Sequence, residues 1–183
     1  GTVSGAANQF KFVVTARWIP EKSDAGQQFM SLRYWITGDL GVGFDYRPLI
    51  DQLKFNATYR LVSEDPKGWR PAVLLGTSFD DFTSKGVQTE SRSYFATVSK
   101  AMPRLKFFNI TPSPYVGAVW IDRLNETRPL AGINLTHEEA SLMVQYSGTD
   151  THLTLSRKIN EKLSLSAIYW GMKYPGAALR YRF

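Results

Sequence analysis

The sequence predicts an all-β protein: a single antiparallel up-and-down transmembrane β-barrel of about twelve strands, with about ten to fourteen compatible with the pattern. Three observations predict this fold. Apolar and polar residues alternate along most of the chain, turn-forming sequences separate the alternating runs, and the chain ends in an alternating run that closes on Phe183. Alternation with a period of two is typical of strands whose two faces meet different surroundings.

Composition restricts the possible functions before any motif is considered. The chain has 183 residues, and no linker or shift in composition divides it, so we expect one barrel domain over residues 1–183. It has no Cys and only two His, which excludes thiolate zinc sites and leaves little for histidine-based ones. We therefore expect neither a metal nor a cofactor. No segment has the ~18 consecutive apolar residues of a transmembrane helix.

The four clearest strands lie in the first third of the chain. The alternating runs cover residues 10–18, 30–37, 40–46 and 53–61. In the last of these, Leu53, Phe55 and Tyr59 share one face, whereas Lys54 and Asn56 share the other. None of the four runs has the spacing of an amphipathic helix.

The remaining runs are shorter or less regular. They cover residues 72–79, 93–99, 105–121, 130–135, 142–147, 152–159, 163–172 and 177–183. We interpret 105–121 as one long strand bent at Pro112 and Pro114, because proline is tolerated at strand edges, bulges and ends. Turn sequences such as 65–68 and 174–176 connect the runs, which makes consecutive strands antiparallel neighbours.

The residue types on the two faces favour a membrane barrel over a soluble one. Tyr and Trp residues lie near strand ends on the apolar face, as in the interfacial girdles of outer-membrane barrels. The proposed girdle consists of Trp18, Tyr46, Tyr59, Tyr94, Tyr146, Tyr169 and Tyr181. The opposite face is rich in Gly, Ser, Thr, Asn and charged residues, which suits a wet lumen. The alternative is a soluble barrel or sandwich with these aromatic residues in its core.

The end of the chain resembles the C-terminal recognition strand of bacterial outer-membrane barrels. Leu179, Tyr181 and Phe183 share one face, and the barrel-assembly machinery reads such an alternation as an assembly signal. The resemblance implies a location in the bacterial outer membrane, in contact with its lipid and lipopolysaccharide. It also implies the assembly machinery as a partner during biogenesis. Both termini would then be periplasmic, with the loops 80–92 and 122–128 outside the cell.

A finer resemblance covers residues 40–100. The segment 69–77, then Asp80, then the segment 93–100 are similar to consecutive elements of the YjbH-type outer-membrane barrels. The chain departs from that pattern at Arg70, which lies between the Trp and the Pro, and it is shorter than full-length members. The YjbH-type barrels are associated with capsule or exopolysaccharide production. The resemblance therefore implies a link to polysaccharide secretion, with other envelope or secretion proteins as partners.

Charged residues on the polar face suggest what the lumen binds. The net charge is +6, and pairing of the last strand with the first would join several cationic side chains into one basic wall. The wall consists of Lys11, Arg17, Arg33, Lys54, Arg60, Arg180 and Arg182. Fixed positive charge in a narrow passage favours anions, and Arg binds carboxylates and phosphates with two hydrogen bonds. We expect a passive channel or export accessory for anionic solutes or polysaccharide.

Several alternatives stay open from the sequence. The arginines can instead pair with loop carboxylates or be hydrated in an ordinary polar lumen. Inward aromatic side chains can plug the barrel, which would then serve as an anchor or as a subunit of a larger envelope complex. The residues considered for this plug are Trp35, Phe95, Phe108, Trp120 and Trp170.

Enzymatic and nucleic-acid-binding functions have little support in the sequence. A lipid hydrolase would need His152 beside a serine such as Ser141, Ser147 or Ser156, and the sequence shows no assembled triad. We therefore expect that the protein is not an enzyme. No run of Lys and Arg interleaved with aromatic residues forms a patch, so we expect no nucleic-acid partner.

Overall fold

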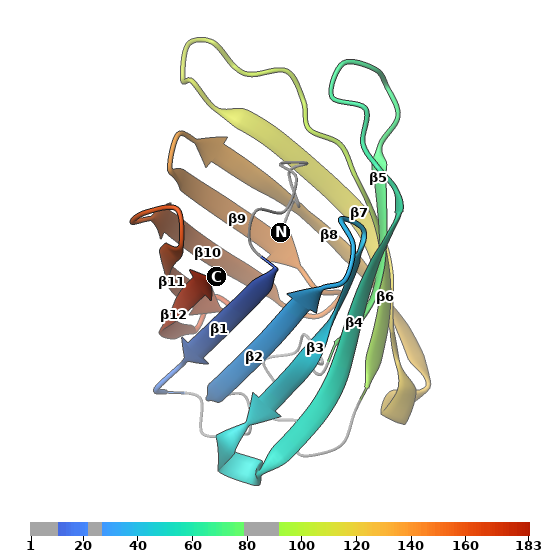
Figure 1. The fold of residues 1–183 in the computed structure, drawn as a ribbon, viewed down its shortest axis with the longest axis vertical. Coiled ribbons are helices and arrows are strands. Elements are labelled where there is room, and N and C mark those ends of the chain that lie inside the picture. The colour runs from blue at the N-terminus through green and yellow to red at the C-terminus, as the bar shows by residue number, and fades with distance from the viewer. Residues whose placement is uncertain (1–10, 22–26, 79–91) are drawn as a thin grey trace.

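Twelve strands form one closed antiparallel barrel in this computed structural model, which describes residues 11–21, 27–78 and 92–183 (Figure 1). The predicted fold class is confirmed. The strands are β1 (Phe12–Trp18), β2 (Gln28–Trp35), β3 (Leu40–Arg47), β4 (Gln52–Val62), β5 (Ala72–Ser78), β6 (Ser93–Ser99), β7 (Thr111–Ile121), β8 (Glu126–His137), β9 (Ala140–Tyr146), β10 (Thr151–Lys158), β11 (Leu163–Trp170) and β12 (Tyr174–Arg182).

Two short 3₁₀ helices lie in connections between strands. They are η1 (Pro48–Ile50), between β3 and β4, and η2 (Asp122–Leu124), between β7 and β8. No helix in the described ranges is long and apolar enough to cross a membrane.

Pairing between the first and last strands closes the barrel. β1 pairs with β12 from Val13↔Arg182 to Trp18↔Ala177, and with β2 on its other side. The ladder continues past the strand ends, because Phe12 N–H donates to Phe183 O at 2.9 Å and Phe183 N–H donates to Phe12 O at 3.0 Å. Closure leaves no open edge whose backbone groups would need another chain or water.

The two ends of the barrel differ in what they carry. The start of β1 and the end of β12 lie at one end of the barrel, here called the terminus end. The β4–β5 and β6–β7 connections lie at the same end and form the loops at the top of Figure 1. The opposite or distal end carries η1 and η2. The predicted exterior loop 122–128 also lies at the distal end but is shorter, since β8 already begins at Glu126. Apart from Arg92, the predicted loop 80–92 lies outside the described residues.

The prediction of one bent strand over 105–121 was wrong in its first half. Residues 105–110 form a connection with an isolated bridge between Leu105 and Ile110, and β7 begins at Thr111. Pro112 and Pro114 lie inside β7, beyond the point where its pairing with β6 ends at Tyr115. Their carbonyls accept N–H groups from Met102 and Lys100. In an antiparallel strand the backbone N and O of one residue point to the same side. The nitrogens of Pro112 and Pro114, which carry no hydrogen, therefore point to the side of β7 where pairing with β6 has already ended.

The predicted turn at 174–176 was also wrong, because those residues begin β12. The turn lies at residues 171–173, where Gly171 and Met172 have positive φ values of 60° and 51°. Pro175 lies beyond the last β1–β12 pair, Trp18↔Ala177, so one side of the strand lacks a ladder there. Proline is tolerated in a strand at such positions.

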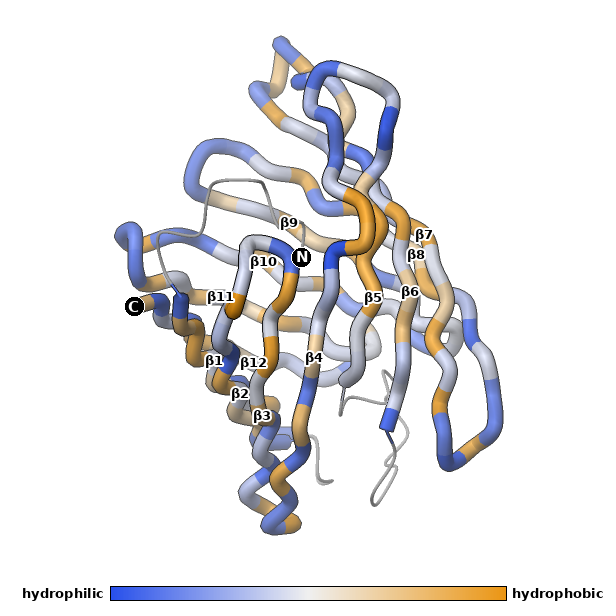
Figure 2. The backbone as a smooth tube through the Cα atoms, turned by 45° about the vertical axis from the view of Figure 1, so that its right-hand side comes forward, coloured by the Kyte–Doolittle hydropathy of each residue, from blue (hydrophilic) through white to orange (hydrophobic). Residues whose placement is uncertain are grey.

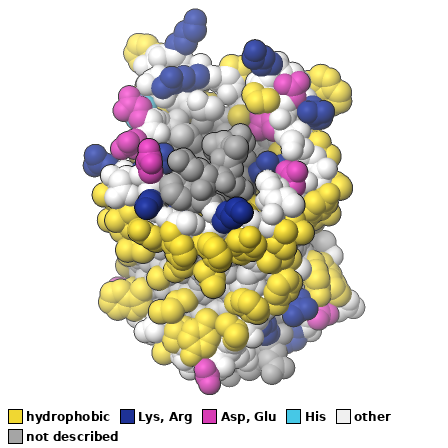
Figure 3. All heavy atoms as spheres, viewed as in Figure 1, with side chains coloured by type: hydrophobic (Ala, Val, Ile, Leu, Met, Phe, Trp, Pro, Cys, Tyr) yellow, Lys and Arg dark blue, Asp and Glu magenta, His cyan; other side chains and the backbone are white. Residues whose placement is uncertain are grey.

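The barrel wall is polar inside and apolar outside. In β4, Asn56 and Thr58 are buried in the interior, whereas Phe55 and Tyr59 on the alternate positions are exposed. In Figure 2 the tube accordingly alternates between hydrophobic and hydrophilic colours along the wall. Figure 3 shows the result on one face of the molecule: hydrophobic side chains form a broad band across the barrel, with charged side chains mainly above and below it. A soluble barrel would have these faces reversed.

Inward aromatic side chains are accommodated by glycines on the neighbouring strand. Three register pairs join an inward aromatic to an inward glycine: Trp35↔Gly41, Phe95↔Gly76 and Tyr115↔Gly132. A Cβ atom added at Gly41 would lie 3.1 Å from the Trp35 ring, and one at Gly76 would lie 2.5 Å from the Phe95 ring. The rings therefore lie against the wall, in space that a side chain would otherwise fill.

Substitution of Gly117 should destabilise the barrel. A Cβ atom there would collide with the backbone oxygen of Ala96 and lie 2.9 Å from the Thr97 Cα, so β6 and β7 would have to separate. We expect Gly117→Ala to lower the free energy of unfolding by about 1–3 kcal/mol, measured by urea titration in detergent. Gly38→Ala is the matched control, because nothing lies within 4 Å of its added Cβ. Equal stability of the two variants would contradict this account.

Candidate functional site

The predicted basic wall lies on the inner face of the barrel. In the strand registers, Arg33 lies opposite Val13 and Gly43, and Arg180 lies opposite Thr15. Lys54 lies opposite Asp45, which is buried with 3% of its surface exposed. Lys11, Arg17, Arg60 and Arg182 fall on the same face by the alternation of their strands. The wall is not uniform, because some of these cations already have partners within the barrel.

Three members of the wall are held by neighbouring side chains. Arg60 forms an ion pair with Asp39, with Nη1 and Oδ1 3.5 Å apart. The Arg17 guanidinium lies 4.8 Å from the centre of the Phe29 ring and 4.5 Å from that of Trp170, which is cation–π geometry on both sides. Lys54 is the register partner of the buried Asp45.

Arg33 belongs to a polar network over β2, β3 and β4. Its Nη2 donates to Asn56 Oδ1 at 3.5 Å, and Asn56 Nδ2 donates to Asp45 Oδ1 at 2.6 Å. Asn56 is fully buried. Gly43 lies between Arg33 and Asn56 in the register, and because it has no side chain the Arg33 side chain can reach Asn56 over it. The network thus satisfies a buried amide and carboxylate inside the wall, where an unpaired charge would be costly.

The two arginines of β12 have a different environment. Arg180 and Arg182 face the lumen beside β1, where the inward residues are Val13 and Thr15, and Arg33 lies on the far side of β1. Arg180 is subject to repulsion from both Arg182 and Arg33. Closure therefore brings together arginines from opposite ends of the chain, as predicted.

Three further basic residues of the described inner face were not predicted from the sequence. Arg47 extends the inward series of β3 and is buried, Arg128 lies in β8 rather than in a loop, and Lys158 lies in the same row as Ser164 and Arg180. Extending the run 40–46 by one residue would have found Arg47, whereas Lys158 already lies in the run 152–159, on the same face as Thr154 and Ser156. Arg128 was missed because its segment was interpreted as a loop.

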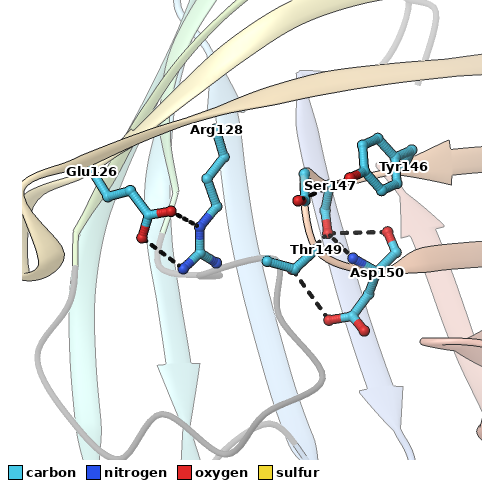
Figure 4. Close-up of polar contacts among 7 residues, drawn as sticks. Glu126, Arg128, Tyr146, Ser147, Thr149 and Asp150 are labelled. Atoms are coloured by element: carbon cyan, nitrogen blue, oxygen red, sulfur yellow. Dashed lines mark hydrogen bonds and ion pairs between the residues drawn. The ribbon is translucent and has the colours of Figure 1, made fainter.

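The distal rim is fixed by short polar contacts (Figure 4). Arg128 makes two hydrogen bonds to Glu126, Nε–Oε1 at 3.0 Å and Nη2–Oε2 at 2.9 Å. In the neighbouring β9–β10 turn, Ser147 Oγ donates to Asp150 O at 3.1 Å and Tyr146 Oη donates to Gly148 O at 2.9 Å. A Cβ atom at Gly148 would lie 2.7 Å from that of Arg128, so this turn packs directly on β8.

At the terminus end, the β4–β5 and β6–β7 connections are tied together. Lys100 Nζ lies 3.1 Å from Glu64 Oε1 and donates to Asp65 O at 2.6 Å. Asp65 also accepts backbone N–H groups from Lys67 and Gly68, and these bonds hold the pKa of its carboxyl below the usual value. These contacts give that rim a defined shape.

Apolar side chains fill part of the lumen near the distal end. One buried cluster consists of Ile19, Ile168 and Trp170, and a second on the opposite wall consists of Val119, Ile121 and Leu130, with Phe95 beside it. Of the aromatics predicted to plug the lumen, Trp35, Phe95 and Trp170 point inward. The other two assignments were wrong: Trp120 stacks on Tyr94 outside the barrel, and Phe108 is exposed in the β6–β7 connection.

The predicted girdle and assembly-signal residues lie on the outer face. Trp18, Tyr46, Tyr94, Tyr146 and Tyr169 are towards the distal end, and Tyr59 and Tyr181 towards the terminus end. Leu179, Tyr181 and Phe183 follow one another along the outer side of the closing seam, where Phe183 stacks on Phe12 with ring centres 5.5 Å apart. Their roles at a membrane and in assembly stay predictions.

Serine and histidine side chains are not arranged as a nucleophile and base in the described part of the chain. His152 Nδ1 accepts the Gly171 N–H at 2.9 Å, and its ring lies 4.1 Å from that of Trp170. Ser156 Oγ lies 2.8 Å from Ser166 Oγ instead, and Ser147 bonds within its own turn. Within the described ranges, no group of three or more His, Asp or Glu side chains could hold a metal ion.

The segments that carry the finer resemblance occupy neighbouring parts of the wall. Residues 72–77 lie in β5 and residues 93–99 in β6, paired from Ala72↔Ser99 to Ser78↔Ser93, while Asp80 lies outside the described residues. Comparison with known proteins adds nothing to this resemblance: no family model, no curated protein and no solved structure matches the chain. The shared property that the structure does support is the closed antiparallel barrel.

Proposed function

We propose that the protein is a bacterial outer-membrane barrel. The observation that carries this proposal is the outer face, where large apolar side chains such as Trp18, Leu53 and Val116 are more than half exposed. In water, an exposed apolar surface of this kind would promote aggregation, whereas in a membrane it would be covered by lipid. Aromatic residues near both ends of the wall suit the two membrane interfaces. Lipid and lipopolysaccharide would then be its surroundings.

Within that membrane, we propose a passive route or export accessory for anionic solutes rather than an enzyme. Support comes from Arg33, Arg180 and Arg182, which place positive charge inside the barrel at the terminus end. Arginine in a confined passage attracts anions and repels cations. The resemblance to polysaccharide-associated barrels extends this proposal to an acidic polysaccharide as cargo, with envelope or secretion proteins as partners.

A plugged barrel is the second candidate, and a different observation favours it. The buried clusters around Trp170 and Ile121 narrow the lumen near the distal end, on opposite walls. If they close it, the protein would act as an anchor or subunit of an envelope complex, and the arginines would face a vestibule open only at the terminus end.

Membrane insertion is tested by heat-modifiability on SDS gels. A folded membrane barrel resists SDS until it is boiled, so we expect unboiled and boiled protein, purified in detergent, to migrate differently. Protein that is fully soluble without detergent and shows no shift would contradict the outer-membrane proposal.

Anion passage is tested in planar bilayers under a salt gradient. We expect conductance steps with anion preference, and Arg33→Gln should reduce the anion-to-cation permeability ratio by about twofold to tenfold, because one lumen charge is lost. Arg157→Gln is the control, since Arg157 pairs with Leu165 on the outward face.

A silent bilayer containing folded, heat-modifiable protein would contradict anion passage. The variant Trp170→Ala then tests the plugged barrel. Conductance that appears in this variant and not in the wild type would identify the distal cluster as the plug.

A further inference from the structure

Arg180 and Arg182 differ from the other cations of the basic wall. They are two residues apart on β12, so their Cα atoms are separated by about 6.6 Å and both side chains face the lumen. Neither guanidinium forms an ion pair or hydrogen bond with any residue in the described ranges. Arg60, by contrast, pairs with Asp39, and Arg17 is held between two aromatic rings.

The strands beside this pair place short side chains next to it. Thr15 of β1 and Ser164 of β11 are the inward register partners of Arg180, and Val13 is the partner of Arg182. These short side chains form a floor between longer cations, with Arg33 beyond β1 and Lys158 beyond β11. The hydroxyls of Thr15 and Ser164 add hydrogen-bond donors to this floor.

Among the residues that the structure describes, none forms an ion pair with Arg180 or Arg182. Arg180 is repelled by Arg182 and by Arg33, and of these only Arg33 has a nearby carboxylate, that of Asp45. Arg180 nevertheless keeps a substantial part of its surface accessible, although it points into the barrel. Like charges held close together inside a wall are stabilised when an anion binds between them.

The number of donors favours a tetrahedral dianion over a carboxylate. One bidentate arginine already occupies both oxygens of a carboxylate, which carries a single negative charge. A phosphate or a phosphate ester offers three or more acceptor oxygens and up to two charges near neutral pH, which matches two guanidinium groups.

We infer that Arg180 and Arg182 form a discrete binding site for a tetrahedral dianion at the terminus end of the lumen, with Thr15 and Ser164 as its floor. The inference deepens the proposed function, because it names the class of anion and the first site that such an anion meets from the terminus end. The ligand group is a phosphate, either as the free ion or as the ester group of a sugar.

The test is calorimetric titration of the folded, detergent-solubilised chain at constant ionic strength. The probes are inorganic phosphate, glucose 6-phosphate and acetate. We expect both phosphates to bind and acetate to bind at least about tenfold more weakly. Tighter binding of the sugar phosphate would identify an ester group as the ligand, and equal or tighter binding of inorganic phosphate would identify the free ion.

Variants show whether the two arginines make the site. Arg180→Gln and Arg182→Gln should each weaken phosphate binding by about tenfold or more, and Arg180→Lys, which keeps the charge but loses the second hydrogen bond, should weaken it less. Arg157→Gln on the outer face should bind as the wild type does. Each variant is first checked for heat-modifiability, so that a folding defect is not read as lost binding.

Two results would overturn the inference: phosphate binding no tighter than that of acetate, or unchanged binding in both glutamine variants. The assay does not depend on conduction. If the barrel binds phosphate but is silent in bilayers, anion passage is refuted and the proposed binding site stands. If it is an anion-selective channel that does not bind phosphate, only the proposed binding site is refuted.

Discussion

Hydrogen bonding between β1 and β12 is the constraint on which the rest of the molecule depends. An open sheet of this length would leave the backbone groups of two edge strands without partners in the sheet. Closure also creates an inside and an outside, so that the alternation of each strand sorts its side chains into two environments. Through the same pairing, Arg180 and Arg182 at the end of the chain become neighbours of Arg33 across Val13 and Thr15.

Glycine placement decides how much of the interior stays available. Trp35, Phe95 and Tyr115 are too large to share a narrow barrel if all of them extend towards its axis. Each lies opposite an inward glycine, and its ring occupies the position of the missing side chain. The aromatic rings gain packing against the wall, and the space in front of them is left to polar side chains.

The two halves of the lumen have different physical character. Near the distal end, apolar clusters around Trp170 and Ile121 are buried, and the Arg17 guanidinium lies over the rings of Phe29 and Trp170. Towards the terminus end, Arg180 lies beside the hydroxyl-bearing residues Thr15 and Ser164, and Arg182 lies beside Val13. Under the proposed function, an anion entering from the terminus end would meet Arg180 and Arg182 before it meets the two apolar clusters, and that order would distinguish a binding vestibule from a uniform pore.

The sequence by itself determined the fold class, the strand faces and the inward position of the basic residues, because apolar and polar residues alternate within each short segment and this alternation can be recognised locally. It misplaced residues 105–110 and 174–176, since proline in a strand depends on whether a ladder lies beside it. Only the tertiary structure decided which cations are balanced: Asp39 meets Arg60, Trp170 meets Arg17, and Arg180 meets further arginines. Those encounters depend on register around the closed sheet, which no single segment encodes.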